Sequence, residues 1–171
     1  MVSSLSKEVL PIITYVSLPA YDAYQQGHLF HLELRTTPSA TFSLTTHGMI
    51  AEGLMHALKR VVLILAGLHH DWQPFKKHHY HLVSGNHRAC VRDARSSGLP
   101  LCLALLNMLR AQQGLNQIEH LTGTGILRLD GSFEEAHLEN VKKEVALNNS
   151  THFLTSYQCN HVFKLATLMN G

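Results

Sequence analysis

The chain has 171 residues, of which 45% are apolar and 15% are charged, and its net charge is +2 with neutral histidines. This length and composition fit one globular domain and exclude a disordered or fibrous chain. The small and scattered positive charge argues against a nucleic-acid partner and against an acidic membrane surface.

The cysteines and the apolar runs indicate a cellular compartment. Cys90, Cys102 and Cys159 are odd in number and show no CxxC spacing, which is typical of reduced thiols. Residues 1–15 lack the continuous apolar core of an export signal. The longest apolar run, residues 61–68, is too short to span a bilayer. We therefore expect a cytoplasmic protein without a membrane partner.

The first half of the chain contains alternating and helical patterns. Residues 1–26 predict an N-terminal strand or arm, and the main domain is expected over residues 27–171. Period-two alternation predicts strands near residues 30–34 and 41–45. Helical spacing of apolar residues predicts an amphipathic helix over residues 50–67, followed by a strand at residues 79–83.

The second half is organised around one strongly apolar segment. Residues 99–109 are apolar on nearly every side, which predicts a helix buried between layers. A hairpin is expected at residues 126–133, followed by a helix over residues 136–147. A last strand, residues 151–155, precedes a closing helix at residues 161–169. The predicted fold class is α/β (α+β), a single domain with a mixed sheet and packed helices.

Two serines stand at the start of the buried helix. A hydroxyl at a helix N-terminus lies beside unpaired backbone N–H groups that can hold an oxyanion, so this position suits a nucleophile. Ser96 and Ser97 are the candidates. The alternative is that either serine simply caps the helix.

A lysine in the helix after the predicted hairpin is a candidate base. Leu138, Val141 and Val145 form its apolar stripe, and Lys142 lies at the edge of that stripe while Lys143 points away. Burial lowers a lysine pKa and favours the neutral amine. The alternative is a lysine that reaches solvent from the helix surface.

Together these segments resemble the proteolytic domain of Lon proteases. The stretch RDARSSGL (residues 92–99) resembles the family's KDGPSAG signature, and the apolar LCLALL (residues 101–106) follows it. LTGTGILRLDG (residues 121–131) resembles the TGE-I-x-L-x-G strand pair. ENVKKEV (residues 139–145) resembles the motif that carries the family's lysine, and a weaker likeness covers residues 41–62.

The resemblance implies a fold like the second domain of the small-subunit ribosomal protein number five, and Ser–Lys peptidase chemistry. By motif position, Ser96 is the nucleophile, Lys142 the general base and Thr122 the residue that orients the lysine. Backbone amides near Ser97 and Gly98 would hold the oxyanion. The implied reaction uses no cofactor and no metal.

The sequence also departs from the family pattern. Arg95 replaces the motif proline. Either Thr124 stands where the family has a glutamate, or an inserted Thr124-Gly125 displaces that position. Placing Lys142 at the base position requires about two extra residues after Gly131 by motif counting; otherwise Asn140 falls there and the site is inactive. Parts of the chain also resemble the non-proteolytic ATPases ComM and RadA.

Two functions follow as expectations. The first is a Lon-like serine peptidase domain without its own ATPase, which cleaves peptides or unfolded protein and forms a homo-oligomer. It would need either a separate ATPase or unfoldase, or substrates that are already unfolded. The second is an inactive module of the same fold that serves in interaction or assembly. The histidine-rich residues 69–81 include His79 and His81 on one strand face, a half-site that leaves metal binding open, although no established zinc spacing is present.

Overall fold

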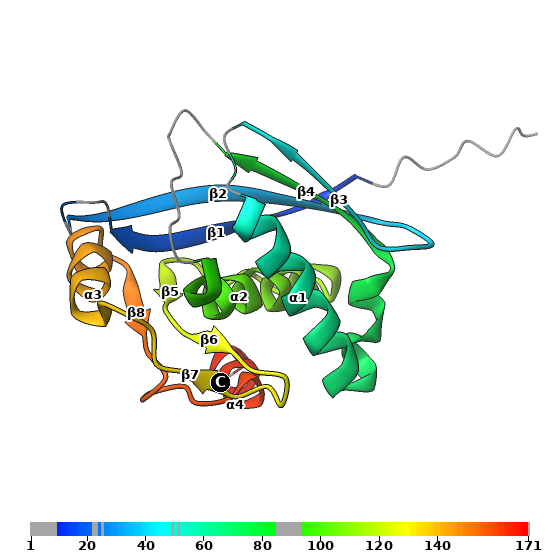
Figure 1. Cartoon of the computed structure of the whole chain (residues 1–171). Coiled ribbons are helices and arrows are strands. Elements are labelled where there is room, and N and C mark those ends of the chain that lie inside the picture. The colour runs from blue at the N-terminus through cyan, green and yellow to red at the C-terminus, as the bar shows by residue number, and fades with distance from the viewer. Residues whose placement is uncertain are drawn as a thin grey trace, which may run out of the picture.

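The computed structural model describes residues 10–21, 24, 26–48, 50, 52–84 and 94–170. Its main sheet has the strand order β1-β2-β4-β3 (Figure 1). The strands are β1 (Ile12–Tyr21), β2 (Gly27–Pro38), β3 (Ser43–His47) and β4 (His78–Ser84). The pairs β1–β2 and β2–β4 are antiparallel, whereas β3 and β4 are parallel, so the sheet is mixed.

The remaining elements lie below this sheet in the view of Figure 1. The helices are α1 (Glu52–Leu68), α2 (Gly98–Gln112), α3 (Glu139–Asn148) and α4 (Val162–Asn170), with the 3-10 helices η1 (His70–Lys76) and η2 (Ala94–Ser97). Two small sheets complete the fold. They pair β5 (Leu121–Gly123) with β8 (His152–Leu154) in parallel, and β6 (Ile126–Leu127) with β7 (Phe133–Glu134) in antiparallel register.

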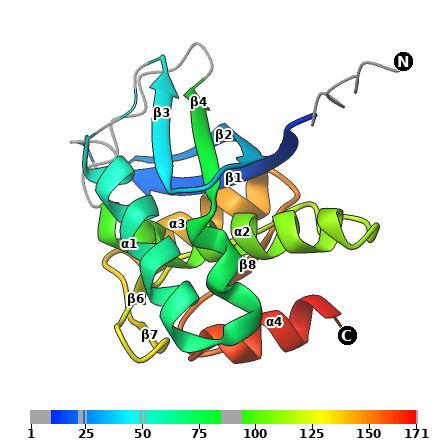
Figure 2. The same cartoon turned by 90° about the vertical axis from the view of Figure 1, so that its right-hand side faces the viewer.

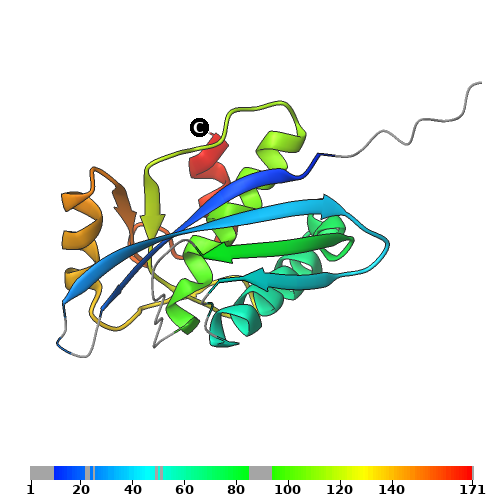
Figure 3. The same cartoon turned by 90° about the horizontal axis from the view of Figure 1, so that it is seen from above.

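The core forms between one face of the sheet and the helices. Leu32 and Leu34 of β2 are fully buried because alternate residues of the strand point to the helix side. Tyr80 of β4 is buried beside them, and its hydroxyl donates a hydrogen bond to the Phe75 carbonyl. In Figure 3 the sheet lies in front of the helices, so the described helices cover only its other face.

Helix α2 is the centre of the domain. Every residue from Gly98 to Met108 is buried, which matches its nearly uniform apolar sequence. It contacts β1, α1, α4 and β6, and Figure 2 shows it between the sheet and α4. A helix surrounded on all sides has a fixed position, so the residues at its N-terminus are held firmly.

The predicted elements correspond closely to the observed ones, with three differences. Leu121–Gly123 forms a separate strand, β5, and the strands after α2 pair in two small sheets outside the main one. Helix α3 begins at Glu139 rather than at residue 136, because Leu138 has a left-handed backbone with a φ of 54°. Residues 12–21 of the expected N-terminal strand or arm form β1, which pairs with β2 along its whole length.

None of the helices in the described part of the chain has the length and apolar character needed to traverse a bilayer.

Candidate functional site

The backbone around Ser96 is held in place by the loop that joins β5 to β6. The Gly125 N–H donates to the Ser96 carbonyl at 3.2 Å, and the Leu99 N–H donates to the Gly125 carbonyl at 3.2 Å. These two hydrogen bonds join the start of α2 to the β5–β6 loop. Ser96 therefore has a defined backbone position at the N-terminal end of the central helix.

Gly98 allows this close fit. A Cβ atom at this position would lie 2.8 Å from the Leu127 backbone nitrogen and 3.0 Å from the Gly125 carbonyl oxygen. Both neighbours are backbone atoms of a paired segment, so neither can move aside easily. Only glycine lets the first turn of α2 rest directly on β6.

Lys142 extends from α3 to the same point. Its Nζ donates hydrogen bonds to Ser96 Oγ at 3.1 Å and to Thr124 Oγ1 at 3.3 Å. The three residues come from α3, η2 and the β5–β6 loop, and all are buried: Lys142 and Thr124 are 1% exposed and Ser96 is 6% exposed. The structure thus brings Ser96 and Lys142 together, while their catalytic roles stay a prediction.

The geometry distinguishes the candidates that the sequence left open. Ser96, and not Ser97, contacts the lysine, and the Ser97 side chain makes no capping hydrogen bond although Ser97 is the N-cap residue of α2. Asn140 and Lys143 are both exposed, so among these α3 residues Lys142 occupies the position beside Ser96. The motif residues Arg92 and Asp93, and Cys90 before them, lie outside the described residues.

The side chain of Thr122, the residue expected to orient the lysine, bonds to β1. Its hydroxyl donates to the Ser17 carbonyl of β1, and Thr124 is the threonine that contacts Lys142. The reason is that β5 ends at Gly123, after which the Thr124 N–H bonds to the Leu154 carbonyl at 3.0 Å and the chain turns towards η2.

The electrostatic setting of the lysine includes a carboxylate one turn earlier in α3. Glu139 accepts a hydrogen bond from the Ala136 N–H at 3.2 Å. Burial raises the pKa of Glu139, while the charge of Lys142 acts in the opposite direction.

Other nucleophile candidates are less suited to chemistry. Cys102 of α2 is fully buried, and burial raises the pKa of its thiol, so it stays protonated and belongs to the core as expected. Cys159 is a second free and buried thiol, and burial also raises its pKa.

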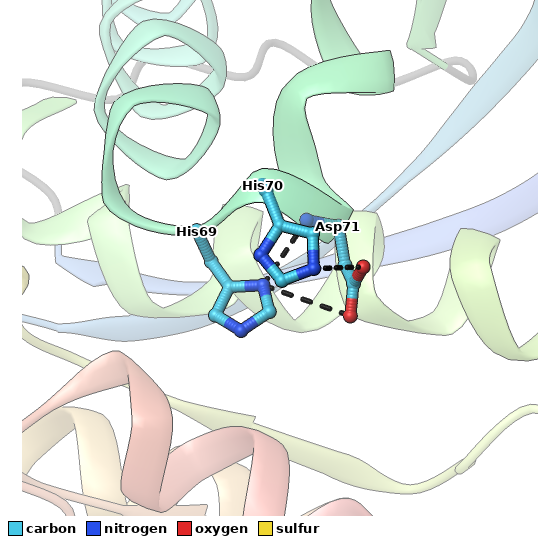
Figure 4. Close-up of side chains that lie close together, drawn as sticks. All are labelled: His69, His70 and Asp71. Atoms are coloured by element: carbon cyan, nitrogen blue, oxygen red, sulfur yellow. Dashed lines mark hydrogen bonds and ion pairs between the residues drawn. The ribbon is translucent and has the colours of Figure 1, made fainter.

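Within the residues that the structure describes, one group of side chains could hold a metal ion. Ligand atoms of His69, His70 and Asp71 lie within 4.8 Å of one another at the start of η1 (Figure 4). The carboxylate of Asp71 lies 3.0 Å from His70 Nε2 and 3.7 Å from His69 Nδ1, which also accepts the Asp71 N–H. These contacts would have to open for a cation to bind.

His79 and His81 share one face of β4, as the alternation predicts, but their ring nitrogens bond to hydroxyl groups of β3. His79 lies 2.6 Å from Ser43 Oγ and 3.0 Å from Thr45 Oγ1, and His81 lies 2.7 Å from Thr45 Oγ1. This register joins the parallel strands β3 and β4. His79 and His81 therefore link β4 to β3 through side-chain hydrogen bonds.

No protein-family model matches this sequence, and no curated protein matches it.

Proposed function

We propose that this chain is a serine peptidase domain that hydrolyses peptides or unfolded protein with a Ser96–Lys142 dyad. The observation that carries the proposal is the 3.1 Å contact between Lys142 Nζ and Ser96 Oγ, made by two buried groups at the N-terminus of a buried helix. A hydroxyl and an amine within hydrogen-bond distance are the requirement for amine-assisted nucleophilic attack.

In the first step, neutral Lys142 accepts the hydroxyl proton of Ser96. The Ser96 oxygen attacks the carbonyl carbon of the peptide bond, and a tetrahedral oxyanion forms. Backbone N–H groups of Ser97 and Gly98, at the positive end of α2, are the candidate donors for this oxyanion. The C–N bond then breaks, and the departing amine takes the proton from the Lys142 ammonium.

In the second step, water replaces the amine. Lys142 takes a proton from the attacking water, the acyl–oxygen bond to Ser96 breaks, and the proton returns to the Ser96 oxygen. Thr124 holds the amine in the direction of Ser96 through the 3.3 Å contact. The cycle thus restores the Ser96 hydroxyl and the neutral Lys142 amine, and it consumes one water molecule for each peptide bond.

We further propose that the fold is that of the Lon proteolytic domain and of its relative in the small-subunit ribosomal protein number five. Support comes from the motif order: the serine precedes the buried helix α2, and the lysine lies in α3 after the hairpin of β6 and β7. The fold is mixed α/β, with a mixed sheet.

The burial of the dyad bears on the form of the substrate. Because Ser96 is 6% exposed and Lys142 is 1% exposed, only an extended chain could reach them. We therefore propose that a separate ATPase or unfoldase supplies unfolded substrate, that the domain acts as a homo-oligomer, and that it works in the cytoplasm. The free thiols of Cys102 and Cys159 support a reducing compartment.

The same burial supports a second candidate function. The buried cluster of a lysine, a serine and a threonine could also have a purely structural role. Its hydrogen bonds would then fix the junction of α2, α3 and the β5–β6 loop. The chain would then be an inactive interaction or assembly module, as ComM- and RadA-like domains are.

The test measures cleavage of an unfolded, casein-like substrate by the purified chain. The peptidase proposal expects activity that falls about a thousandfold or more in both Ser96→Ala and Lys142→Ala. Two adjacent substitutions are the matched controls: Ser97→Ala keeps the backbone amide, and Lys143→Ala removes an exposed lysine of the same helix. Both should retain activity.

The outcomes separate the two functions. Activity that persists in Ser96→Ala comes from another source and excludes the dyad. Absence of cleavage by a folded wild-type protein, with a stability loss in Lys142→Ala, favours the structural module.

A further inference from the structure

A pocket of about 830 Å³ lies beside the candidate nucleophile. Ala94, Arg95 and Gly98, which flank Ser96 in the chain, form one of its walls, while Ser96 itself is not among its lining residues. Helix α1 and strand β6 both contact η2, and together with His137 they supply the other described lining residues. The volume suits a ligand of several side chains, so a peptide held at Ser96 could place a residue there.

The polar groups of this pocket are basic. Its described lining contains two arginines and two histidines and no carboxylate: Arg60 and His56 of α1, Arg95 of η2, and His137 before α3. The acid that α1 contributes near these groups is Glu52, whose exposed carboxylate lies 3.5 Å from His56 Nε2 and is not part of the pocket lining.

The remaining lining is apolar. Ala57 and Val61 of α1 and Leu127 of β6 are buried and provide surface for a methylene chain. The Arg60 guanidinium spans the pocket and donates to the Leu127 carbonyl at 3.4 Å. This long hydrogen bond uses one of the five N–H groups of the arginine.

We infer that this pocket binds an acidic side chain of the peptide substrate, next to the bond that Ser96 attacks. A glutamate fits because its methylene groups would lie on the apolar wall while its carboxylate meets the Arg60 guanidinium, in the planar geometry that a guanidinium prefers. The inference rests on the proposed peptidase function, because it assigns the substrate class of that site.

The experiment measures binding separately from cleavage. A fluorescein-labelled, unstructured peptide with one central glutamate is titrated into the Ser96→Ala protein, together with matched peptides that carry glutamine or lysine at that position. The glutamate peptide should bind about tenfold more tightly than the glutamine peptide, and this difference should shrink as salt is added. Cleavage of the same peptides is then measured with the wild-type protein.

Charge reversal in the pocket is the sharper test. Arg60→Glu, in the Ser96→Ala background, should remove the preference for glutamate and favour the lysine peptide. The matched control is Lys59→Glu, because Lys59 is the exposed neighbour of Arg60 on α1 and is absent from the pocket lining. Arg95→Gln provides a second variant on a different element, so the test does not depend on α1 alone.

Each outcome has a definite meaning. Loss of the glutamate preference in Arg60→Glu and Arg95→Gln, but not in Lys59→Glu, supports the inference. Equal binding of the three peptides overturns it, and wild-type cleavage that also ignores the central residue would leave the peptidase proposal intact. Preferential glutamate binding without cleavage by the wild-type protein supports the pocket and rejects the peptidase.

Discussion

Lys142 lies 3.1 Å from Ser96 although the two residues are 46 positions apart in the chain. One comes from the helix after the β6–β7 hairpin and the other from the turn before the central helix. Burying a lysine is energetically costly unless its surroundings compensate, so this contact needs a reason in either stability or chemistry.

Replacement of Lys142 by methionine separates these two reasons. Methionine has a similar length and no charge, so the free energy of unfolding should change by less than about 2 kcal/mol, since relief of desolvation offsets the lost hydrogen bonds. Peptidase activity should nevertheless fall about a thousandfold. Chemical denaturation and a cleavage assay on the same protein check this. A large loss of stability would point to a structural lysine.

The two threonines should respond differently to substitution. Thr124→Val removes a contact of the Lys142 amine and should lower kcat/KM about tenfold or more, equivalent to ~1.4 kcal/mol, and shift its pH profile. Thr122→Val removes the hydrogen bond to the Ser17 carbonyl and should cost about 1 kcal/mol of stability with an unchanged pH profile. Equal pH profiles in both variants would contradict a positioning role for Thr124.

Close packing around β5 predicts that Gly123 does not tolerate a larger residue. A Cβ atom at Gly123 would lie 2.4 Å from the Leu154 carbonyl oxygen and 2.7 Å from Leu99 Cδ2, so Gly123→Ala should destabilise the protein by at least about 1–3 kcal/mol. Gly67→Ala is the matched control, since a Cβ atom there meets nothing within 4 Å and a helical alanine should add about 0.5 kcal/mol. Thermal unfolding of both variants measures the contrast.

The turn between β6 and β7 predicts an acid dependence of stability. Asp130 Oδ1 accepts hydrogen bonds from the Ser132 hydroxyl and N–H, which lower the pKa of Asp130 below its ordinary value of 3.8. Because the pKa of Asp130 is lower in the folded state than in the unfolded state, its carboxylate stabilises the native state at pH values above the unfolded-state pKa. This contribution is lost as the pH falls through the folded-state pKa.

Asp130→Asn should therefore flatten the dependence of the unfolding free energy on pH below about 4. Denaturant unfolding at several acidic pH values measures it. Ser132→Ala removes the donor hydroxyl and should have a smaller effect in the same direction. If the unfolding free energy of Asp130→Asn depended on acidic pH as steeply as that of the wild type, the Asp130 carboxylate would not contribute to the acid dependence of stability.

The sequence predicted the elements whose patterns are local. The alternation around Leu32 and Leu34 identified β2, and the uniform apolarity of residues 99–109 identified the buried helix α2. The apolar stripe of α3 placed Lys142 at the edge of its buried face, where the structure buries it. Helical and strand periodicities suffice for these features because each depends on neighbours within one element.

Features that depend on contacts between distant segments were not predictable. Thr122 and Thr124 are equivalent by residue type, and only the pairing of β5 with β8 and the contact with Ser17 decide which one meets the lysine. The basic pocket likewise collects Arg60, Arg95 and His137 from three separate parts of the chain. No local pattern encodes such a convergence.

The most direct test of the central claim is the reactivity of the Ser96 hydroxyl. The folded protein is incubated with a fluorophosphonate, which modifies activated serines, and its intact mass and modified peptide are followed by mass spectrometry. The account predicts one adduct, on Ser96, which forms at least about a hundredfold more slowly in Lys142→Met than in Lys143→Met. An equal rate in the two variants, or an adduct on another serine, would contradict the assignment of Lys142 as the base that activates Ser96.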